Sequence, residues 1–332
     1  MTTIHTQIYD LPANPEELPL PPEDLPEDEW RARWLEMRDP GLGGSDAATV
    51  LDLSPWTSRY ALWCEKRGQE SAFGGSEATQ WGHLLEEVVA REAARRLGKA
   101  VVSSPVMFRS RTHPFMLANV DRLLLDENSC PEGILEVKTT DASNAASWSK
   151  GQAPVYYVCQ VMHYMAVTGL RYAVLACLVG GNKLIMVTVY ADDQMIADIV
   201  ASEEAFWHQV CSGECPPVDG SASATAALGV RYPGIPETAV ELAGDTAEAL
   251  VHRGRLFEEK KAIEAQIAEI DNLVRAALGD AESGTVHGTS VVTWKTQERT
   301  TVDSKALAAE EPEIFERFAR QSSSRVLRYR AA

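Results

Sequence analysis

Two strand-like runs within residues 114–139 constrain this chain most, because they place charged residues inside otherwise apolar segments. The first run carries Asp121, and the second carries Glu136 and Lys138 in the tripeptide E-V-K. Side chains two apart on a strand share a face, so Glu136 and Lys138 should lie together while Val137 packs into the core. If the two runs pair, Asp121 reaches the same edge and completes a carboxylate pair beside a lysine. This pattern suits a metal site, but it also suits an ion pair on a solvated strand, and the segment alone leaves both open.

Helix-like and strand-like segments follow each other in an order that indicates the fold class. After a helical start, three strand-like runs precede a helix, and two more strands and another helix follow. This order predicts an α/β (α+β) fold in which helices flank a mixed central β-sheet. The expected helices cover residues 28–39, 58–67, 77–97, 142–150, 155–168 and 192–212, and the expected strands cover 101–108, 115–125, 134–138, 172–179 and 184–190.

Composition divides the chain into four parts. Residues 1–28 hold six prolines and no lysine or arginine, so they are expected to form an acidic, disordered tail. Residues 29–215 form the expected main domain, and 216–240, rich in glycine, proline and small residues, is the expected linker. Residues 241–332 are expected to form a small C-terminal module with a long helix, a β-hairpin and a basic end.

Three local patterns define this C-terminal module. A capping box opens a helix over 245–278, whose apolar residues recur every seven positions, as in a packing arm or in a coiled-coil helix. A hairpin is expected around Gly288, followed by a helix over 304–320 and a last strand over 326–329. The arginines near the end suit contacts with phosphates as well as a solvated surface.

Charge and hydropathy argue against two broad classes of protein. The formal net charge of −17 over 332 residues disfavours a protein that coats nucleic acid nonspecifically. No apolar run approaches the length of a membrane span, and the N-terminus lacks the features of a signal peptide. A cytoplasmic protein without membrane contact is therefore expected.

The cysteines are scattered, and most lie in apolar segments where reduced core residues are expected. The exception is the group His208, Cys211 and Cys215, which has metal-ligand residue types at close spacing. Because this group lacks a fourth ligand nearby, a structural role is the favoured interpretation.

Five short motifs stand in sequence order. They are W-x2-M-R-x2-G-x-G-G-S-D at 34–46, W-G-x3-E at 81–86, A-N-V-D at 118–121, L-E-V-K at 135–138 and Q-V-x-x-Y at 160–164. Together they resemble the phage recombination exonucleases of the lambda-exonuclease or YqaJ type, within the PD-(D/E)xK nuclease superfamily. The resemblance covers about residues 30–212, and it departs from the usual pattern at Asn119 and Val120, where relatives more often have a proline or glycine beside the aspartate.

The resemblance implies a PD-(D/E)xK core that uses two divalent ions, Mg²⁺ or in its place Mn²⁺. Asp121, Glu136 and the Val137 carbonyl are the expected ligands of one ion. Glu86, with Asp121, is expected to hold the second ion.

The resemblance also implies roles for four further side chains. Lys138 is expected to position the attacking water and help deprotonate it, with a pKa lowered by its metal-crowded site. Gln160 is expected to orient Lys138 or the scissile phosphate. Arg38 and Ser45, beside a glycine turn whose free backbone N–H groups favour anions, are expected to hold a 5′-phosphate.

The implied activity is digestion of one strand of duplex DNA from an end, in the 5′-to-3′ direction. The 3′ single-stranded tail left behind is the substrate of an annealing protein, and relatives close into a trimeric ring around DNA. Two alternatives stay open. One is an iron–sulfur nuclease of the CRISPR-associated type that uses Cys64, Cys211, Cys215 and one other ligand. The other is a catalytically silent module that binds DNA ends or a partner.

Overall fold

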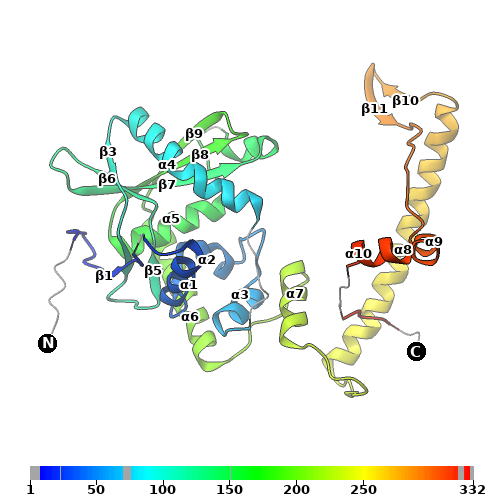
Figure 1. The fold of residues 1–332 in the computed structure, drawn as a ribbon, viewed down its shortest axis with the longest axis horizontal. Coiled ribbons are helices and arrows are strands. Elements are labelled where there is room, and N and C mark those ends of the chain that lie inside the picture. Colours follow the sequence, from blue (N-terminus) through cyan, green and yellow to red (C-terminus); the bar gives the residue numbers. More distant parts are fainter. Residues whose placement is uncertain (1–7, 23, 70–75, 150, 321–324, 330–332) are drawn as a thin grey trace. The chain divides into compact units, whose positions relative to one another are not determined.

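The computed structural model describes residues 8–22, 24–69, 76–149, 151–320 and 325–329 (Figure 1). The chain divides into two compact units, residues 1–233 and 234–332, which are described one at a time. None of the described helices is both long enough and apolar enough to cross a membrane.

A five-stranded mixed sheet forms the centre of the first unit. Its order is β3 (Ala100–Val102), β6 (Arg122–Leu125), β7 (Pro131–Thr140), β8 (Tyr172–Val179) and β9 (Lys183–Tyr190). Strands β7 and β8 are parallel, and the other neighbouring pairs are antiparallel. The mixed α/β fold class predicted from the element order is therefore confirmed.

Two helices, α4 (Glu77–Leu97) and α5 (Val155–Thr168), cover opposite faces of this sheet (Figure 1). The strand residues clustered with α4 are Leu124, Leu135, Val137, Val174 and Ala176, and those clustered with α5 are Leu123, Ile134, Ala173, Leu175 and Cys177. Because successive strand residues alternate between faces, Glu136 and Lys138 lie on the α5 side. Val137 is 7% exposed and packs toward α4, as the sequence pattern predicts.

A second sheet of four strands runs beside the first. Its order is β1 (Glu16–Pro19), β4 (Val106–Arg109), β5 (Met116–Ala118) and β2 (Leu42–Gly43). The predicted single strands 101–108 and 115–125 are wrong, because each run divides between the two sheets. Pro105, which has no backbone N–H, lies in the first break, and Asp121 lies in the second. Asp121 thus stands where the chain passes from one sheet into the other.

The prediction of a disordered tail is wrong for its described residues, 8–22 and 24–28. Strand β1 pairs antiparallel with β4, and Leu11 is 2% exposed. The Arg109 Nε donates to Glu16 Oε2 at 2.8 Å, so one of the acids has a specific partner. Residues 1–7 and 23 lie outside the described residues.

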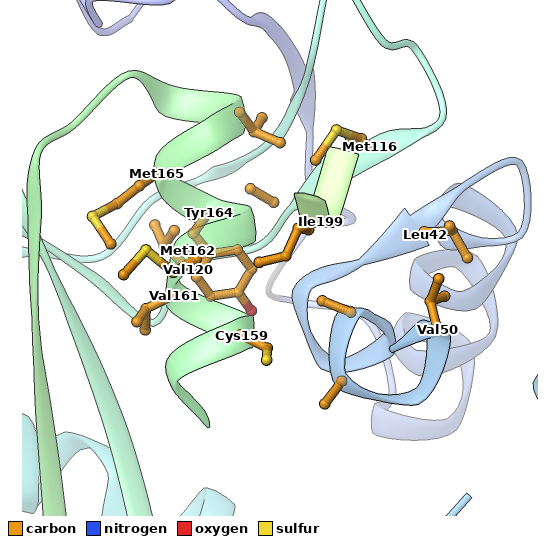
Figure 2. Close-up of a cluster of buried hydrophobic side chains, with 14 of the residues drawn as sticks. Leu42, Val50, Met116, Val120, Cys159, Val161, Met162, Tyr164, Met165 and Ile199 are labelled. Atoms are coloured by element: carbon orange, nitrogen blue, oxygen red, sulfur yellow. The ribbon is translucent and has the colours of Figure 1, made fainter. Parts of the chain in front are cut away.

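Helix α2 (Gly44–Val50) packs closely against α5, and Figure 2 shows part of the buried hydrophobic cluster to which both helices contribute. Leu42 and Val50 lie on the α2 side, while Val161 and Tyr164 project from α5 (Figure 2). A Cβ on Gly44 would lie 2.5 Å from the Tyr164 ring, so only glycine fits at this crossing.

Four further elements of the first unit correspond to expected helices. They are α1 (Glu27–Arg38), α3 (Arg59–Lys66), the 3₁₀ helix η1 (Ala142–Trp148) and α6 (Asp193–Ser212). These agree closely with the expected helices, except that residues 142–148 adopt the tighter 3₁₀ form.

The predicted linker 216–240 is wrong in its first half, because α7 (Ala222–Arg231) belongs to the first unit. Ala224 and Ala227 are buried, and the Ser58 N–H donates to Ser223 Oγ at 3.0 Å. The small residues of this segment were interpreted as a flexible linker. In the structure they lie on a helix, where small side chains allow close packing against α3.

The second unit contains α8 (Asp245–Leu278), β10 (Ser283–Val286), β11 (Thr289–Thr293), α9 (Ser304–Glu310) and α10 (Pro312–Phe318). The long helix and the hairpin agree with the sequence analysis. The single helix expected over 304–320 is wrong, because Pro312 starts a separate helix. The strand expected over 326–329 is also wrong, since these residues form no strand with the described part of the chain.

Candidate active site

Two carboxylates and a lysine meet where β6 and β7 begin to pair. The Val137 N–H donates to Asp121 Oδ2 at 2.8 Å, which holds Asp121 against β7. Glu136 is 2% exposed, and its Oε1 accepts from Lys138 Nζ at 2.7 Å. The structure thus brings together the three side chains that the strand pattern singled out.

Gln160 joins this group from α5. Its Nε2 donates to Glu136 Oε1 at 2.6 Å and to the Tyr164 hydroxyl at 3.0 Å. The sequence analysis expected Gln160 to orient Lys138 or a phosphate, but its observed contact is with Glu136. Since Lys138 and Gln160 donate to the same oxygen, Glu136 Oε2 is left buried and without a hydrogen-bond partner among the described residues.

The electrostatics of the group follow from its burial. Burial and the charge of Glu136 raise the pKa of Asp121 well above its ordinary value, although Lys138 opposes the rise. Burial likewise raises the pKa of Glu136 against the lowering effect of Lys138. Burial lowers the pKa of Lys138, but the two carboxylates outweigh it and raise that pKa above its ordinary value. Lys138 is therefore an ammonium cation in this arrangement. The lower pKa expected for it beside bound metal ions stays a prediction.

The donor set fits a hard divalent cation. Asp121 and the unpartnered Oε2 of Glu136 supply carboxylate oxygens, the ligands that Mg²⁺ and Mn²⁺ prefer. A cation there would also offset the burial and the neighbouring carboxylate charges that raise both pKa values. The contact of Val137 with Asp121 is made by the Val137 N–H. The role of the Val137 carbonyl as a metal ligand stays a prediction.

Glu86 is turned toward a different partner. Its Oε1 accepts from Arg122 Nη1 at 2.7 Å, and Arg122 Nη2 also binds Glu87 Oε2 at 2.9 Å. In the described ranges no three His, Cys, Asp or Glu side chains form a group able to hold a metal ion. Glu86 nevertheless raises the pKa of Asp121 through its charge, so it lies close enough to act on the site.

A second cluster surrounds the start of α2. Arg38 Nη2 donates to Ser45 Oγ at 3.0 Å and forms an ion pair with Asp46 Oδ2 at 3.2 Å. Lys66 Nζ binds the same carboxylate oxygen at 3.2 Å. Although burial raises the pKa of Asp46, the two cations and the Gly43 N–H bring it to about 2. Two cations, Arg38 and Lys66, thus share one carboxylate oxygen beside Ser45.

Sequence reasoning missed several of these contacts. Lys66 lies outside the motif that carries Arg38 and Ser45, and nothing in its local pattern distinguishes it. Arg122 could have been found, because it directly follows Asp121 at the start of a strand. Tyr157, whose ring lies 5.0 Å from Lys138 Nζ, resembled an ordinary apolar helix residue.

The cysteines of the iron–sulfur alternative belong to no group of three or more metal ligands among the described residues, although burial and the nearby Cys215 both raise the pKa of Cys64. Cys64 is buried, Cys211 and Cys215 are exposed, and all three are free thiols. The Arg231 Nη1 donates to Cys215 Sγ at 3.4 Å. His208, Cys211 and Cys215 form no metal-binding group with other described residues.

Comparisons with known proteins give the chain its relatives. The family model of the YqaJ-like viral recombinase domain matches residues 33–171. The uncharacterized protein YqaJ of Bacillus subtilis (strain 168) is 34% identical over 300 residues, which are 89% of this chain and 92% of that protein.

Two solved structures are more distant. An alkaline exonuclease from Laribacter hongkongensis aligns with a TM-score of 0.46 at 19% identity, over 55% of this chain and 93% of its own. A phage-related exonuclease from Haemophilus somnus 129PT aligns with a TM-score of 0.40 at 14% identity, over 52% of this chain and 96% of its own. The sequence match to the Bacillus protein is the stronger finding, because it extends over most of both chains. On that match and the family model, the chain belongs to the YqaJ-like viral recombinase family.

Proposed function

We propose that this protein is a divalent-metal-dependent exonuclease that digests double-stranded DNA from its ends during phage recombination. The observation that carries the proposal is the pair of the partly buried Asp121 and the buried Glu136, with one Glu136 oxygen unpartnered among the described residues beside a lysine. Membership in a viral recombinase family supports DNA as the substrate.

Two Mg²⁺ ions, or Mn²⁺ in their place, are the proposed cofactors. Asp121, Glu136 and the Val137 carbonyl would hold one ion, and Glu86 with Asp121 would hold the second once Glu86 leaves Arg122. Bound there, the ions supply Lewis-acid stabilisation of the charge that develops on the scissile phosphate.

The chain's own residues set the geometry around that phosphate. Gln160 fixes the Glu136 carboxylate through its 2.6 Å hydrogen bond to Oε1, so the orientation of Oε2 is fixed as well. Lys138, as a cation, holds the other oxygen and places a positive charge where a phosphate would gain negative charge. Bound ions would offset the charges of Glu136 and Asp121 that raise the pKa of Lys138, so that Lys138 would also position the attacking water and help deprotonate it.

The proposed polarity is 5′ to 3′, which leaves a 3′ single strand for an annealing protein in the host cytoplasm. Arg38 and Ser45 are the proposed contacts to the 5′-phosphate. Their 3.0 Å contact and the second cation, Lys66, on the adjoining Asp46 carboxylate support this role. A trimeric ring of identical chains around DNA is the proposed assembly, and sedimentation that finds a monomer digesting processively would reject it.

An end-labelled duplex tests the proposal directly. With Mg²⁺ the protein should degrade linear duplex from its 5′ ends, leave a closed circle intact, and stop when the metal is chelated. A 5′-phosphate should be preferred over a 5′-hydroxyl by about ten- to a hundredfold, because the phosphate gains charge-assisted hydrogen bonds. Persistent degradation of the closed circle, or none of the linear duplex, would reject the exonuclease assignment.

The variant Arg38→Ala should abolish the preference for a 5′-phosphate while digestion of 5′-hydroxyl ends continues. Arg33→Ala is the matched control, since Arg33 pairs only with Glu29 on the same exposed helix face in the contacts described. An unchanged preference in Arg38→Ala would separate this cluster from phosphate recognition.

A further inference from the structure

An exposed tryptophan stands beside the candidate active site. Trp56 lies in the turn between α2 and α3, and 62% of it is exposed. Its ring centroid lies 4.7 Å from that of Tyr156 and 6.3 Å from that of Tyr157. An indole so open to water contributes little to the core. Its packing against two tyrosines therefore suggests a role in binding.

The two tyrosines connect this indole to the acid cluster. Tyr156 and Tyr157 lie 4.5 Å apart, edge to face, and Lys138 Nζ lies 5.0 Å from the Tyr157 ring. The buried Trp148 supports Tyr157 from beneath at 5.6 Å. An unbroken series of ring contacts therefore runs from the surface to the lysine that holds Glu136.

Trp56 also forms part of the wall of an open cleft of about 660 Å³. Pro216 and Pro217 are apolar residues that line the cleft with it, and Ser58 and Ser221 add hydroxyl groups. This volume lies in the range of small-molecule sites and accommodates a nucleotide. Aromatic and proline faces with a few hydroxyl groups suit a flat, polar-edged ring such as a nucleobase.

The charges in the cleft favour bases over phosphates. Asp52 and Asp219 line it together with Arg59, whose guanidinium lies 3.9 Å from Asp52. The carboxylates would repel a phosphate backbone that entered the cleft. The Arg59 guanidinium lies 5.7 Å from the ring centroid of the buried Phe206, so this cation is held at the inner wall of the cleft.

We propose that this Trp56 cleft binds unpaired bases of a DNA strand that enters or leaves the nuclease site, with the strand's phosphates outside. The proposal rests on the nuclease function above and names the part of the protein that holds single-stranded DNA next to the acid cluster. Trp56 acts by stacking, so it holds the strand in place and takes no part in the chemistry.

Binding without catalysis tests the proposal on the full-length protein. In a metal chelator, fluorescence anisotropy would compare a labelled oligothymidylate with an abasic oligonucleotide of the same length. Trp56→Ala should weaken oligothymidylate binding about tenfold or more, and Trp56→Phe should stay near wild type, because a base stacks on either ring. The abasic strand should bind wild type and Trp56→Ala equally weakly. Leu53→Ala is the control, since Leu53 is an exposed apolar residue of the same turn, 42% exposed.

Three results would overturn the cleft proposal. The first is that wild type does not bind oligothymidylate, and the second is that wild type and Trp56→Ala bind it equally. The third is that Trp56→Ala loses the same affinity for the abasic oligonucleotide as for oligothymidylate. Thermal melting of each variant checks that the fold is intact. Duplex digestion by wild type with Mg²⁺, measured in parallel, tests the nuclease function separately. Active wild type with an unaffected Trp56→Ala rejects the cleft alone, and inactive wild type rejects the function on which it rests.

Discussion

Asp121→Asn should abolish DNA cleavage and at the same time make the protein more stable. The rate loss is expected to be on the order of a thousandfold, because the substitution removes a charge from the proposed metal site. The fold should survive, since the asparagine carbonyl can still accept from the Val137 N–H that Asp121 binds. Stability should rise by on the order of 1 kcal/mol at neutral pH, as the repulsion with Glu136 disappears.

The pH dependence of this gain follows from the direction of the pKa shift. The pKa of Asp121 is raised in the folded chain, so ionising Asp121 costs folding free energy. That cost is absent below the ordinary aspartate value of about 3.9 and grows as pH rises from there through the raised folded pKa. The advantage of Asp121→Asn should therefore vanish in acid and reach its maximum above the folded pKa.

Urea unfolding across pH and melting with and without Mg²⁺ measure both effects. Wild type should melt at a higher temperature with millimolar Mg²⁺, because the ion binds only the folded chain, and Asp121→Asn should lose most of this shift. Asp198→Asn is the control, because Asp198 is an exposed carboxylate on α6. Full cleavage by Asp121→Asn would remove Asp121 from the chemistry. A loss of stability in Asp121→Asn at neutral pH would contradict the conclusion that ionised Asp121 costs folding free energy.

Local patterns predicted the parts of the site that depend on neighbouring residues. Period-two alternation placed Glu136 and Lys138 on one strand face, and helical periodicity placed Gln160 on a buried face of α5. The pattern of 115–125 did not show that the run changes sheets between Ala118 and Arg122, since apolar residues dominate both halves. Strand β1 was missed because its partner β4 lies about ninety residues away, and composition carries no trace of that pairing.

Long-range partners explain most of the remaining differences. The contact between Glu86 and Arg122 depends on how α4 lies across the sheet, which no local pattern gives. Lys66 meets Asp46 only because α3 folds back on α2. Glu203, by contrast, left a signal, since it shares one face of α6 with the buried Ile199 and Phe206. An acid on an apolar helix face requires a buried partner.

That partner is His163, and removing it should have the largest effect on stability of any substitution considered. Both side chains are fully buried, with His163 Nδ1 at 2.8 Å from Glu203 Oε1 and Nε2 at 3.0 Å from the Leu117 carbonyl. The carbonyl can only accept, so Nε2 carries a proton. The pair ties α5 and α6 to β5, only four residues before Asp121.

His163→Ala should cost about 3–5 kcal/mol of unfolding free energy, because it leaves the Glu203 carboxylate buried and unpaired. Glu203→Gln should cost less, since an amide can donate to Nδ1 of a neutral imidazole. Glu204→Ala, at the exposed neighbouring position, should stay within about 0.5 kcal/mol of wild type in urea unfolding. A His163→Ala variant as stable as the Glu204→Ala control would show that the pair does not support the fold.

The pH profile separates the charged pair from simple packing. Burial lowers the pKa of His163, but Glu203 outweighs it and the pKa is raised on folding. A raised histidine pKa stabilises the fold fully below the unfolded value of about 6.5, and this contribution is lost as pH rises through the folded value. Glu203, whose pKa burial raises, adds a loss in the same direction. Wild type should therefore lose stability as pH rises above about 6.5, and Glu203→Gln should flatten that slope; an unchanged slope would mean that the pair carries no charge.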